Sequence, residues 1–188
     1  MKLLCISDPH TEFDRFPPSE MPPADACLIA GDLTVWGHRD SQARVNEMGR
    51  AGDWLAALGE RYPALFWIPG NHDIGVTARS FASVPKAVCV LNKTVALGSF
   101  LLHGVSLTPC FDNPMLKQVW DHMTDSRKVD AAAFDFPPVD IVLSHGLPLG
   151  ILNGPGRWGS PGLRHYIARH QPRLVVCGHI HEDGGQRV

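Results

Sequence analysis

Short apolar runs recur along the chain, separated by segments rich in polar residues, glycine or proline. They occupy residues 2–7, 26–30, 65–68, 88–91, 94–102, 141–144 and 174–177. A strand that is covered on both faces is apolar along most of its length, so each run predicts a β-strand inside the protein. The pair Asn92-Lys93 predicts a tight turn between two of these strands.

Two segments between the runs carry apolar residues at helical spacing. In residues 39–58 the spaced positions are Val45, Met48, Gly52, Leu55 and Leu58, and they predict a helix. Residues 162–170 predict a second, shorter helix, whereas residues 108–138 show no clear pattern. Strands that alternate with helices predict an α/β fold built in layers.

Polar residues follow five of the apolar runs, at the point where each predicted strand ends. These clusters are Asp8-Pro9-His10, Gly31-Asp32, Gly70-Asn71-His72-Asp73, Ser144-His145-Gly146 and Gly178-His179-Ile180-His181. Carboxylate, imidazole and amide oxygen atoms are ligands that hard and borderline divalent metals bind. Because open α/β sheets place ligands at the carboxyl ends of their strands, the clusters predict one metal centre at one sheet edge.

Each cluster taken alone has a purely structural alternative. Asp32 could cap a helix or close a turn, Asn71 could belong to a turn, and His145 could be an ordinary strand-end histidine. The joint pattern outweighs these alternatives, since five such clusters in order after apolar runs are very improbable by chance. The remaining histidines are predicted to be surface or packing residues: His38, His103, His122, His165 and His170.

The composition fits a single globular domain over residues 1–188, with 44% apolar and 19% charged residues. A formal net charge of −2 gives no electrostatic reason to expect nucleic acid or a membrane surface as a partner. No apolar run approaches the ~20 residues that span a bilayer, and the N-terminal run is too short for a signal peptide. Three of the five widely spaced cysteines are predicted to be buried thiols. The absence of a CxxC pair predicts no cysteine-based zinc site, and this use of cysteine fits a reducing cytosol.

Taken together, the five clusters resemble the motif set of the calcineurin-like metallophosphoesterase superfamily, over about residues 3–182. Residues 144–152 and 178–182 are more specifically similar to the branch of metallophosphoesterase-domain proteins and class III-like phosphodiesterases. The resemblance implies a four-layer α/β/β/α sandwich. Relatives usually continue beyond the last histidine pair with further strands, whereas only residues 182–188 follow here. A closing strand is therefore expected to be missing, which leaves three alternatives: a trimmed fold, an edge covered by a partner, or a fragment.

The resemblance also implies a dinuclear metal centre. The ligands carried over for the first ion are Asp8, His10 and His181. Those for the second ion are Asn71, His145 and His179, with Asp32 bridging the two ions. Such mixed nitrogen and oxygen ligands suit Mn²⁺, Fe²⁺, Zn²⁺ or Ni²⁺, and we favour Mn²⁺.

The implied reaction is hydrolysis of a phosphodiester by a hydroxide that bridges the two metal ions. His72 is the candidate proton donor to the leaving group, with Asp73 orienting its imidazole. The structural alternatives are a supporting histidine for His72 and an ordinary turn acid for Asp73. Arg157 could bind phosphate and Trp158 could stack on a base, although an exposed loop explains both equally well.

The expected substrates are small phosphate esters such as cyclic nucleotides or other nucleotide-like molecules. A phosphomonoesterase, including a protein phosphatase, is the alternative within the enzymes. A catalytically silent scaffold on the same fold is the alternative of another class, and the complete set of metal-site residues argues against it. A nuclease is disfavoured by the negative net charge. A homo-oligomer remains open, because the sequence carries no signal for it.

Overall fold

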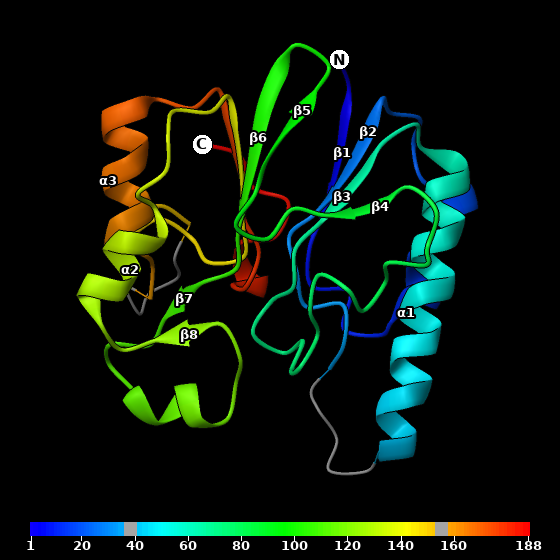
Figure 1. Cartoon of the computed structure of the whole chain (residues 1–188), viewed down its shortest axis with the longest axis horizontal. Coiled ribbons are helices and arrows are strands. Elements are labelled where there is room, and N and C mark those ends of the chain that lie inside the picture. The colour runs from blue at the N-terminus through cyan, green and yellow to red at the C-terminus, as the bar shows by residue number, and fades with distance from the viewer. Residues whose placement is uncertain (36–40, 153–157) are drawn as a thin grey trace.

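Two four-stranded β-sheets lie face to face at the centre of the computed structural model, which describes residues 1–35, 41–152 and 158–188 (Figure 1). The first sheet is entirely parallel and has the order β1 (Leu3–Ile6), β2 (Ala26–Ile29), β3 (Leu65–Trp67), β4 (Ala87–Cys89). The second has the order β10 (Leu174–Val176), β9 (Ile141–Ser144), β6 (Phe100–Val105), β5 (Thr94–Leu97). Only β5 runs antiparallel to its neighbour in that sheet.

Helices cover the outer face of each sheet. Helix α1 (Ser41–Arg61) lies against the first sheet, and helices α2 (Arg127–Ala133) and α3 (Pro161–His170) lie against the second (Figure 1). A small parallel pair, β7 (Thr108–Pro109) and β8 (Met123–Thr124), flanks the second sheet. The 3₁₀ turns are η1 (Phe13–Arg15), η2 (Pro18–Glu20), η3 (Pro114–Gln118) and η4 (His181–Asp183). The predicted four-layer α/β/β/α sandwich is confirmed.

Three hydrophobic clusters correspond to the three interfaces between these layers. Strand β2 shows how one sequence supplies two of them, because successive side chains of a strand point to opposite faces. Cys27 and Ile29 belong to the cluster shared with α1, whereas Leu28 belongs to the cluster between the sheets. The third cluster joins the second sheet to α2 and α3, through residues such as Val142 and Tyr166. Strands buried on both faces explain why the apolar runs are continuous rather than alternating.

The register of each sheet brings the carboxyl ends of its strands level. Ile6 pairs with Ile29, and Ile29 pairs with Trp67, so the loops that follow β1, β2 and β3 begin side by side. In the second sheet Val105 pairs with Ser144, which starts the loops after β6 and β9 together. Both sheets deliver their loops to one end of the sandwich, below the strands in Figure 1.

The predicted strand over residues 94–102 is wrong as a single element. Gly98, with a φ of +61°, turns the chain so that β5 and β6 form an antiparallel hairpin. Its missing Cβ makes this left-handed conformation inexpensive. The Asn92-Lys93 turn does form, with the Lys93 amide donating to the Val90 carbonyl at 3.0 Å. It carries the chain from the first sheet to the second and does not pair neighbouring strands.

A buried carboxylate fixes α3 against α2. Asp130 of α2 accepts hydrogen bonds from Ser160 Oγ at 2.6 Å and from the Gly162 amide at 2.7 Å. Ser160 in turn caps α3, because its Oγ accepts from the Leu163 amide at 2.9 Å. Burial raises the pKa of Asp130, while these two donors oppose the rise. These bonds connect α2, which lies between β6 and β9 in the chain, to the start of α3.

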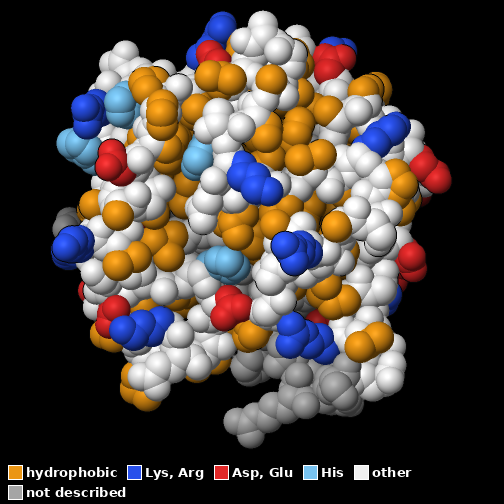
Figure 2. All heavy atoms as spheres, in the orientation of Figure 1, with side chains coloured by type: hydrophobic (Ala, Val, Ile, Leu, Met, Phe, Trp, Pro, Cys, Tyr) orange, Lys and Arg blue, Asp and Glu red, His pale blue; other side chains and the backbone are white. Residues whose placement is uncertain are grey.

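No helix within the described ranges combines the length and the apolar character required to cross a membrane. On the face shown in Figure 2, basic and acidic side chains are interspersed, in keeping with the small net charge.

Candidate metal centre

The loops after β1 and β2 are tied to each other by their backbones, which sets the first ligand candidates in place. The Asp8 amide donates to the Gly31 carbonyl and the His10 amide to the Asp32 carbonyl, both at 3.0 Å. Asp8, His10 and Asp32 have φ values of +54°, +44° and +56°, and His179 has +73°. Non-glycine residues in this left-handed region cost conformational energy and cluster at functional sites.

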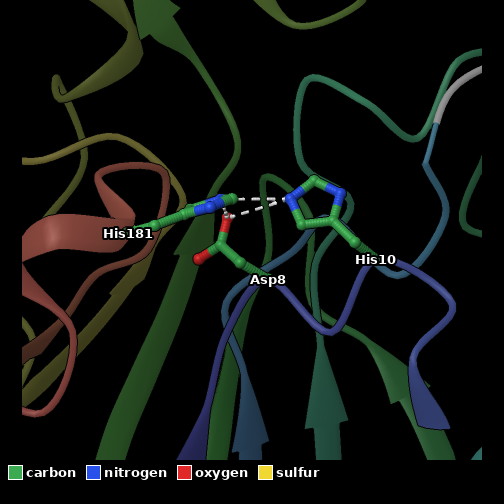
Figure 3. Close-up of side chains that lie close together, drawn as sticks. All are labelled: Asp8, His10 and His181. Atoms are coloured by element: carbon green, nitrogen blue, oxygen red, sulfur yellow. Dashed lines mark hydrogen bonds and ion pairs between the residues drawn. The ribbon is translucent and has the colours of Figure 1, made fainter.

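One end of the centre consists of Asp8, His10 and His181, whose side chains point toward one another (Figure 3). His10 Nε2 and His181 Nε2 lie 3.1 Å apart, and Asp8 Oδ1 lies 3.5 Å from His181 Nε2 and 3.9 Å from His10 Nε2. Donor atoms at such separations can all reach one ion through bonds of about 2.0–2.2 Å. The His181 side chain is 59% exposed, so this end of the centre is open to solvent.

Asp32 occupies the middle of the centre and is almost completely buried. Its Oδ2 lies 3.6 Å from His10 Nε2 and 3.4 Å from His145 Nε2, while its Oδ1 accepts from the His72 amide at 2.7 Å. Burial opposes ionisation, yet the neighbouring His145 outweighs it and holds the pKa of Asp32 well below its usual range. An ionised carboxylate between two groups of donors suits a bridging ligand.

His145 and Asn71 form the buried end of the centre. His145 Nδ1 lies 2.7 Å from the Ala30 carbonyl, and its Nε2 lies 2.8 Å from Asn71 Oδ1. A backbone carbonyl at Nδ1 fixes the tautomer that presents Nε2, as is usual for metal-binding histidines. Burial lowers the pKa of His145, but the Asp32 carboxylate reverses the effect and raises it to about 9.

His179 connects the last cluster to the first. Its amide donates to both carboxylate oxygens of Asp8, at 3.1 and 3.0 Å. The centroids of the His179 and His145 rings lie 5.3 Å apart. Burial lowers the pKa of its imidazole to about 4, so the ring is held in the neutral form that binds metal. A Cβ at Gly178 would collide with Ser7 Oγ and lie 2.7 Å from Asp8 Oδ2, so only glycine permits this approach.

The candidate ligands form three overlapping groups in the described part of the chain, each with donor atoms within 4.8 Å of one another. The groups are Asp8, His10 and His181; His10, Asp32 and His72; and Asp8, Asp32 and His145. His179 lies outside these groups and reaches the centre through its contact with His145. All seven predicted ligand residues therefore gather at one place, and their role as ligands stays a prediction.

His72 lies beside the centre, but its surroundings differ from the prediction. Its Nδ1 contacts the Val35 carbonyl and not Asp73, so Nε2 is the ring nitrogen left for proton donation. Its ring lies against Trp120 with a centroid distance of 4.0 Å and edge-on to His10 at 4.8 Å. The Val35 carbonyl therefore orients the His72 ring, the role that the sequence suggested for the Asp73 carboxylate.

Asp73 holds the loops together, and the expected pairing of its carboxylate with the His72 imidazole is wrong. The fully buried carboxylate accepts from the amides of Leu33 at 3.1 Å, Thr34 at 2.8 Å and Gly70 at 2.8 Å. The Thr34 hydroxyl adds a fourth bond at 2.9 Å. Burial and the charge of Asp32 raise the pKa of Asp73 to about 6, against the pull of these donors. Asp73 thus joins the loops that carry Asp32 and Asn71.

The sequence missed the segment over residues 108–124, which forms one side of a cavity of about 400 Å³ at the centre. Two contacts attach this segment to the loop after β3. The Asp121 amide donates to the Asn71 carbonyl at 3.2 Å, and Asp121 Oδ2 accepts from the Gly75 amide at 2.6 Å. His122, predicted to be a surface or packing residue, is partly buried, and burial is the main cause of its lowered pKa.

The other histidines belong to β6 and α3 or lie outside the described residues. His103 packs on Phe136 with a centroid distance of 3.8 Å and contacts Thr94 Oγ1 at 2.8 Å, as a packing residue would. His165 and His170 belong to α3, away from the centre. His38 and Arg157 lie outside the described residues, whereas Trp158 lines the cavity.

Comparison with known proteins matches nearly the whole chain to one family and to relatives of similar sequence. Residues 1–183 match the family described as calcineurin-like phosphoesterase. The chain is 26% identical over 217 residues to the human metallophosphoesterase domain-containing protein 1, covering 98% of this chain and 61% of that protein. It is 24% identical over 204 residues to the Caenorhabditis elegans UPF0046 protein K07C11.7, covering 98% and 65%. The chain thus spans less than two thirds of the length of these relatives.

A solved structure shares the fold. The crystal structure of TT1561 of Thermus thermophilus superposes with a TM-score of 0.64 at 19% sequence identity. The match covers 93% of this chain and 80% of that one. At this identity the likeness extends to the fold alone.

Proposed function

Because the chain belongs to the calcineurin-like phosphoesterase family, we propose that it is a metal-dependent hydrolase of small phosphodiesters. One observation carries the proposal: the loops of both sheets bring carboxylates and imidazoles into three overlapping donor groups, and the Asn71 amide oxygen lies beside His145 of one group. No other part of the described chain presents such a group. The donors are nitrogen and oxygen without sulfur, which fits two divalent ions such as Mn²⁺, Fe²⁺, Zn²⁺ or Ni²⁺.

The proposed ligands divide between an open and a buried position. Asp8, His10 and His181 would hold one ion, and Asn71, His145 and His179 the other, with Asp32 shared. The first position includes the exposed His181, whereas His145 and Asn71 are fully or nearly fully buried. Water competes more with the protein ligands at the exposed position, so we expect the ion there to be bound more weakly than the buried one.

Two bound ions would neutralise the charge of the phosphate and lower the pKa of the attacking water. The chain's own residues do the rest. Asp32 holds its charge at the centre of the donor groups, and His179 keeps Asp8 oriented through its amide. His72 would give the proton on Nε2 to the departing oxygen as the bond from phosphorus to that oxygen breaks. Its Nδ1 contact with Val35 maintains the ring orientation in either protonation state.

The cavity favours a diester over a monoester. Among the described residues that line it there is no Lys or Arg, and the lining includes the carboxylates of Asp112 and Glu182. A monoester carries up to two negative charges near neutral pH and would find no Lys or Arg among the described lining residues to balance the second charge. A diester carries one, so its electrostatic cost in this cavity is lower.

The test is a metal titration followed by hydrolysis of bis-p-nitrophenyl phosphate and p-nitrophenyl phosphate. We expect two bound ions per chain and faster turnover of the diester. Preference for the monoester would replace the diesterase assignment with a phosphomonoesterase. A fully loaded centre that hydrolyses neither ester would instead support a scaffold role.

We also propose a cytosolic location for the protein. All five cysteines are free, and Cys27, Cys89 and Cys110 are buried. Burial raises the pKa of Cys27 to about 12, which keeps this thiol protonated and unreactive. Free thiols without a disulfide fit a reducing compartment. Non-reducing mass spectrometry of the protein from its native cells would detect any disulfide that contradicts this location.

A further inference from the structure

The cavity beside the metal centre has an apolar wall that the proposed hydrolysis does not itself require. The wall consists of Phe111, Leu116, Trp120 and Met123 from the segment over residues 108–124, together with Trp158 from the loop that precedes α3. The same cavity is lined by Asp32, Asn71 and His179. A phosphate bound at the centre would therefore have one of its ester groups beside aromatic side chains.

The wall is held in a defined position relative to the centre. Trp120 packs on the ring of His72 at a centroid distance of 4.0 Å. The next residue, Asp121, is bonded through its amide to the Asn71 carbonyl and through its carboxylate to the Gly75 amide. A group that binds against the wall is thus placed at a fixed distance from the loop that carries Asn71 and His72.

The wall is also incompletely covered by the protein. The Trp158 residue is 51% exposed, and Phe111, Leu116 and Trp120 are only partly buried. Exposed aromatic surface that lines a cavity is typical of a site for an apolar ligand group. Asp112 and Glu182 at the same cavity would repel a ligand that carries negative charge in that group.

From this geometry we propose that the wall is a specificity subsite for an uncharged, planar aromatic ester group of the substrate. The proposal rests on the proposed hydrolysis and narrows its substrates to aromatic esters with a single phosphate. Aromatic side chains recognise such rings by offset or edge-to-face contact and by burial of their surface. Trp158 is the specificity-determining residue that can be changed without touching a candidate ligand or His72.

Binding can be measured separately from catalysis with phosphinates, which have no ester bond to hydrolyse. We would titrate methyl(phenyl)phosphinate and dimethylphosphinate, which carry a single negative charge as a diester does, into the metal-loaded protein by calorimetry. The phenyl compound is expected to bind about tenfold more tightly, the factor that one good aromatic contact supplies. A (4-carboxyphenyl)methylphosphinate is expected to lose this advantage, because its added charge faces Asp112 and Glu182.

Variants of the wall identify the source of the preference. Trp158→Ala should remove most of the phenyl-to-methyl ratio, and Trp158→Phe should retain most of it. Leu116→Ala should lower the ratio from the other side of the cavity. The matched control is Leu101→Ala, since Leu101 is a 45% exposed apolar residue on β6 that does not line the cavity. Thermal unfolding curves of each variant establish that it is folded.

Hydrolysis separates failure of the subsite from failure of the proposed function. Methyl 2,2,2-trifluoroethyl phosphate and phenyl 2,2,2-trifluoroethyl phosphate share the trifluoroethyl group and differ only in whether the other ester group is aromatic, which avoids a p-nitrophenyl ring that would itself fit the wall. A lower KM for the phenyl ester, lost in Trp158→Ala with kcat little changed, supports the subsite. Turnover of both esters with equal KM, or equal binding of both phosphinates, overturns the subsite and leaves the hydrolase intact. Failure of the loaded protein to hydrolyse either ester overturns the proposed function.

Discussion

Removal of the Asp73 carboxylate is predicted to destabilise the whole sandwich, because this side chain is a buried acceptor shared by two loops. It accepts from the amides of Leu33, Thr34 and Gly70 and from the Thr34 hydroxyl. In Asp73→Ala these four donors stay buried and lose their partner. In Asp73→Asn one oxygen remains, but the new amide group presents hydrogens toward donors that also carry hydrogens.

The magnitude follows from the number of donors. A buried donor left without a partner costs about 1–3 kcal/mol, and water entering the space of the lost carboxylate recovers part of that cost. For Asp73→Ala we therefore expect a loss of about 3–5 kcal/mol in the free energy of unfolding, which is a large fraction of the stability of an average domain. Asp73→Asn should cost nearly as much, since the amide substitutes for only one of the two oxygens.

Urea unfolding of the metal-free protein, followed by far-UV circular dichroism, measures this loss directly. Asp53→Ala is the matched control, because Asp53 is exposed on α1 and its replacement should change stability by less than about 0.5 kcal/mol. If Asp73→Ala unfolds at the same urea concentration as the wild type while kcat falls, the carboxylate acts in catalysis. The structural reasoning would then be refuted.

Four further outcomes are expected. Asp32→Asn should lower the affinity for divalent metal about tenfold or more, measured by calorimetry, and full metal content with normal turnover would exclude a bridging role. His72→Gln should slow hydrolysis of esters with poor leaving groups about 10²-fold or more while sparing p-nitrophenyl esters; equal effects on both would rule out proton donation. Asp130→Ala should cost about 1–3 kcal/mol in urea unfolding, because the start of α3 loses its acceptor, and an unchanged midpoint would contradict this. Burial lowers the pKa of His103 to about 4 from an ordinary value of 6.5. As the pH falls, this histidine is therefore protonated at a higher pH in the unfolded chain than in the folded one. Stability should therefore fall as pH drops from about 6.5 to about 4, and His103→Phe should flatten that part of the profile.

The layers and the candidate ligands could be predicted because both are local patterns. The continuous apolar run at residues 26–30 reports a strand covered on both faces, and the structure buries β2 between α1 and the second sheet. Asp8 and His10 could be assigned to a strand end from their position alone. Their neighbours His179 and His181 come from the other end of the chain, and the order of the sheets brings the two segments together.

Other features could not be predicted, because they depend on contacts between distant segments. The hairpin of β5 and β6 lies within one apolar run of the sequence, and Gly98 alone does not predict that the chain reverses there. The segment over residues 108–124 has no regular pattern, since its shape is set by bonds such as those between Asp121 and the loop after β3.

By itself the sequence determined that this protein has a layered α/β fold with metal-type donors at its strand ends, because the apolar runs and the polar residues that follow them are local patterns. Only the tertiary structure decided which donors face one another, that Asp73 bonds the loops and not His72, and that an aromatic wall stands beside the centre. Those outcomes require the distances between side chains of separate loops, which the register of two sheets and the packing of their layers set.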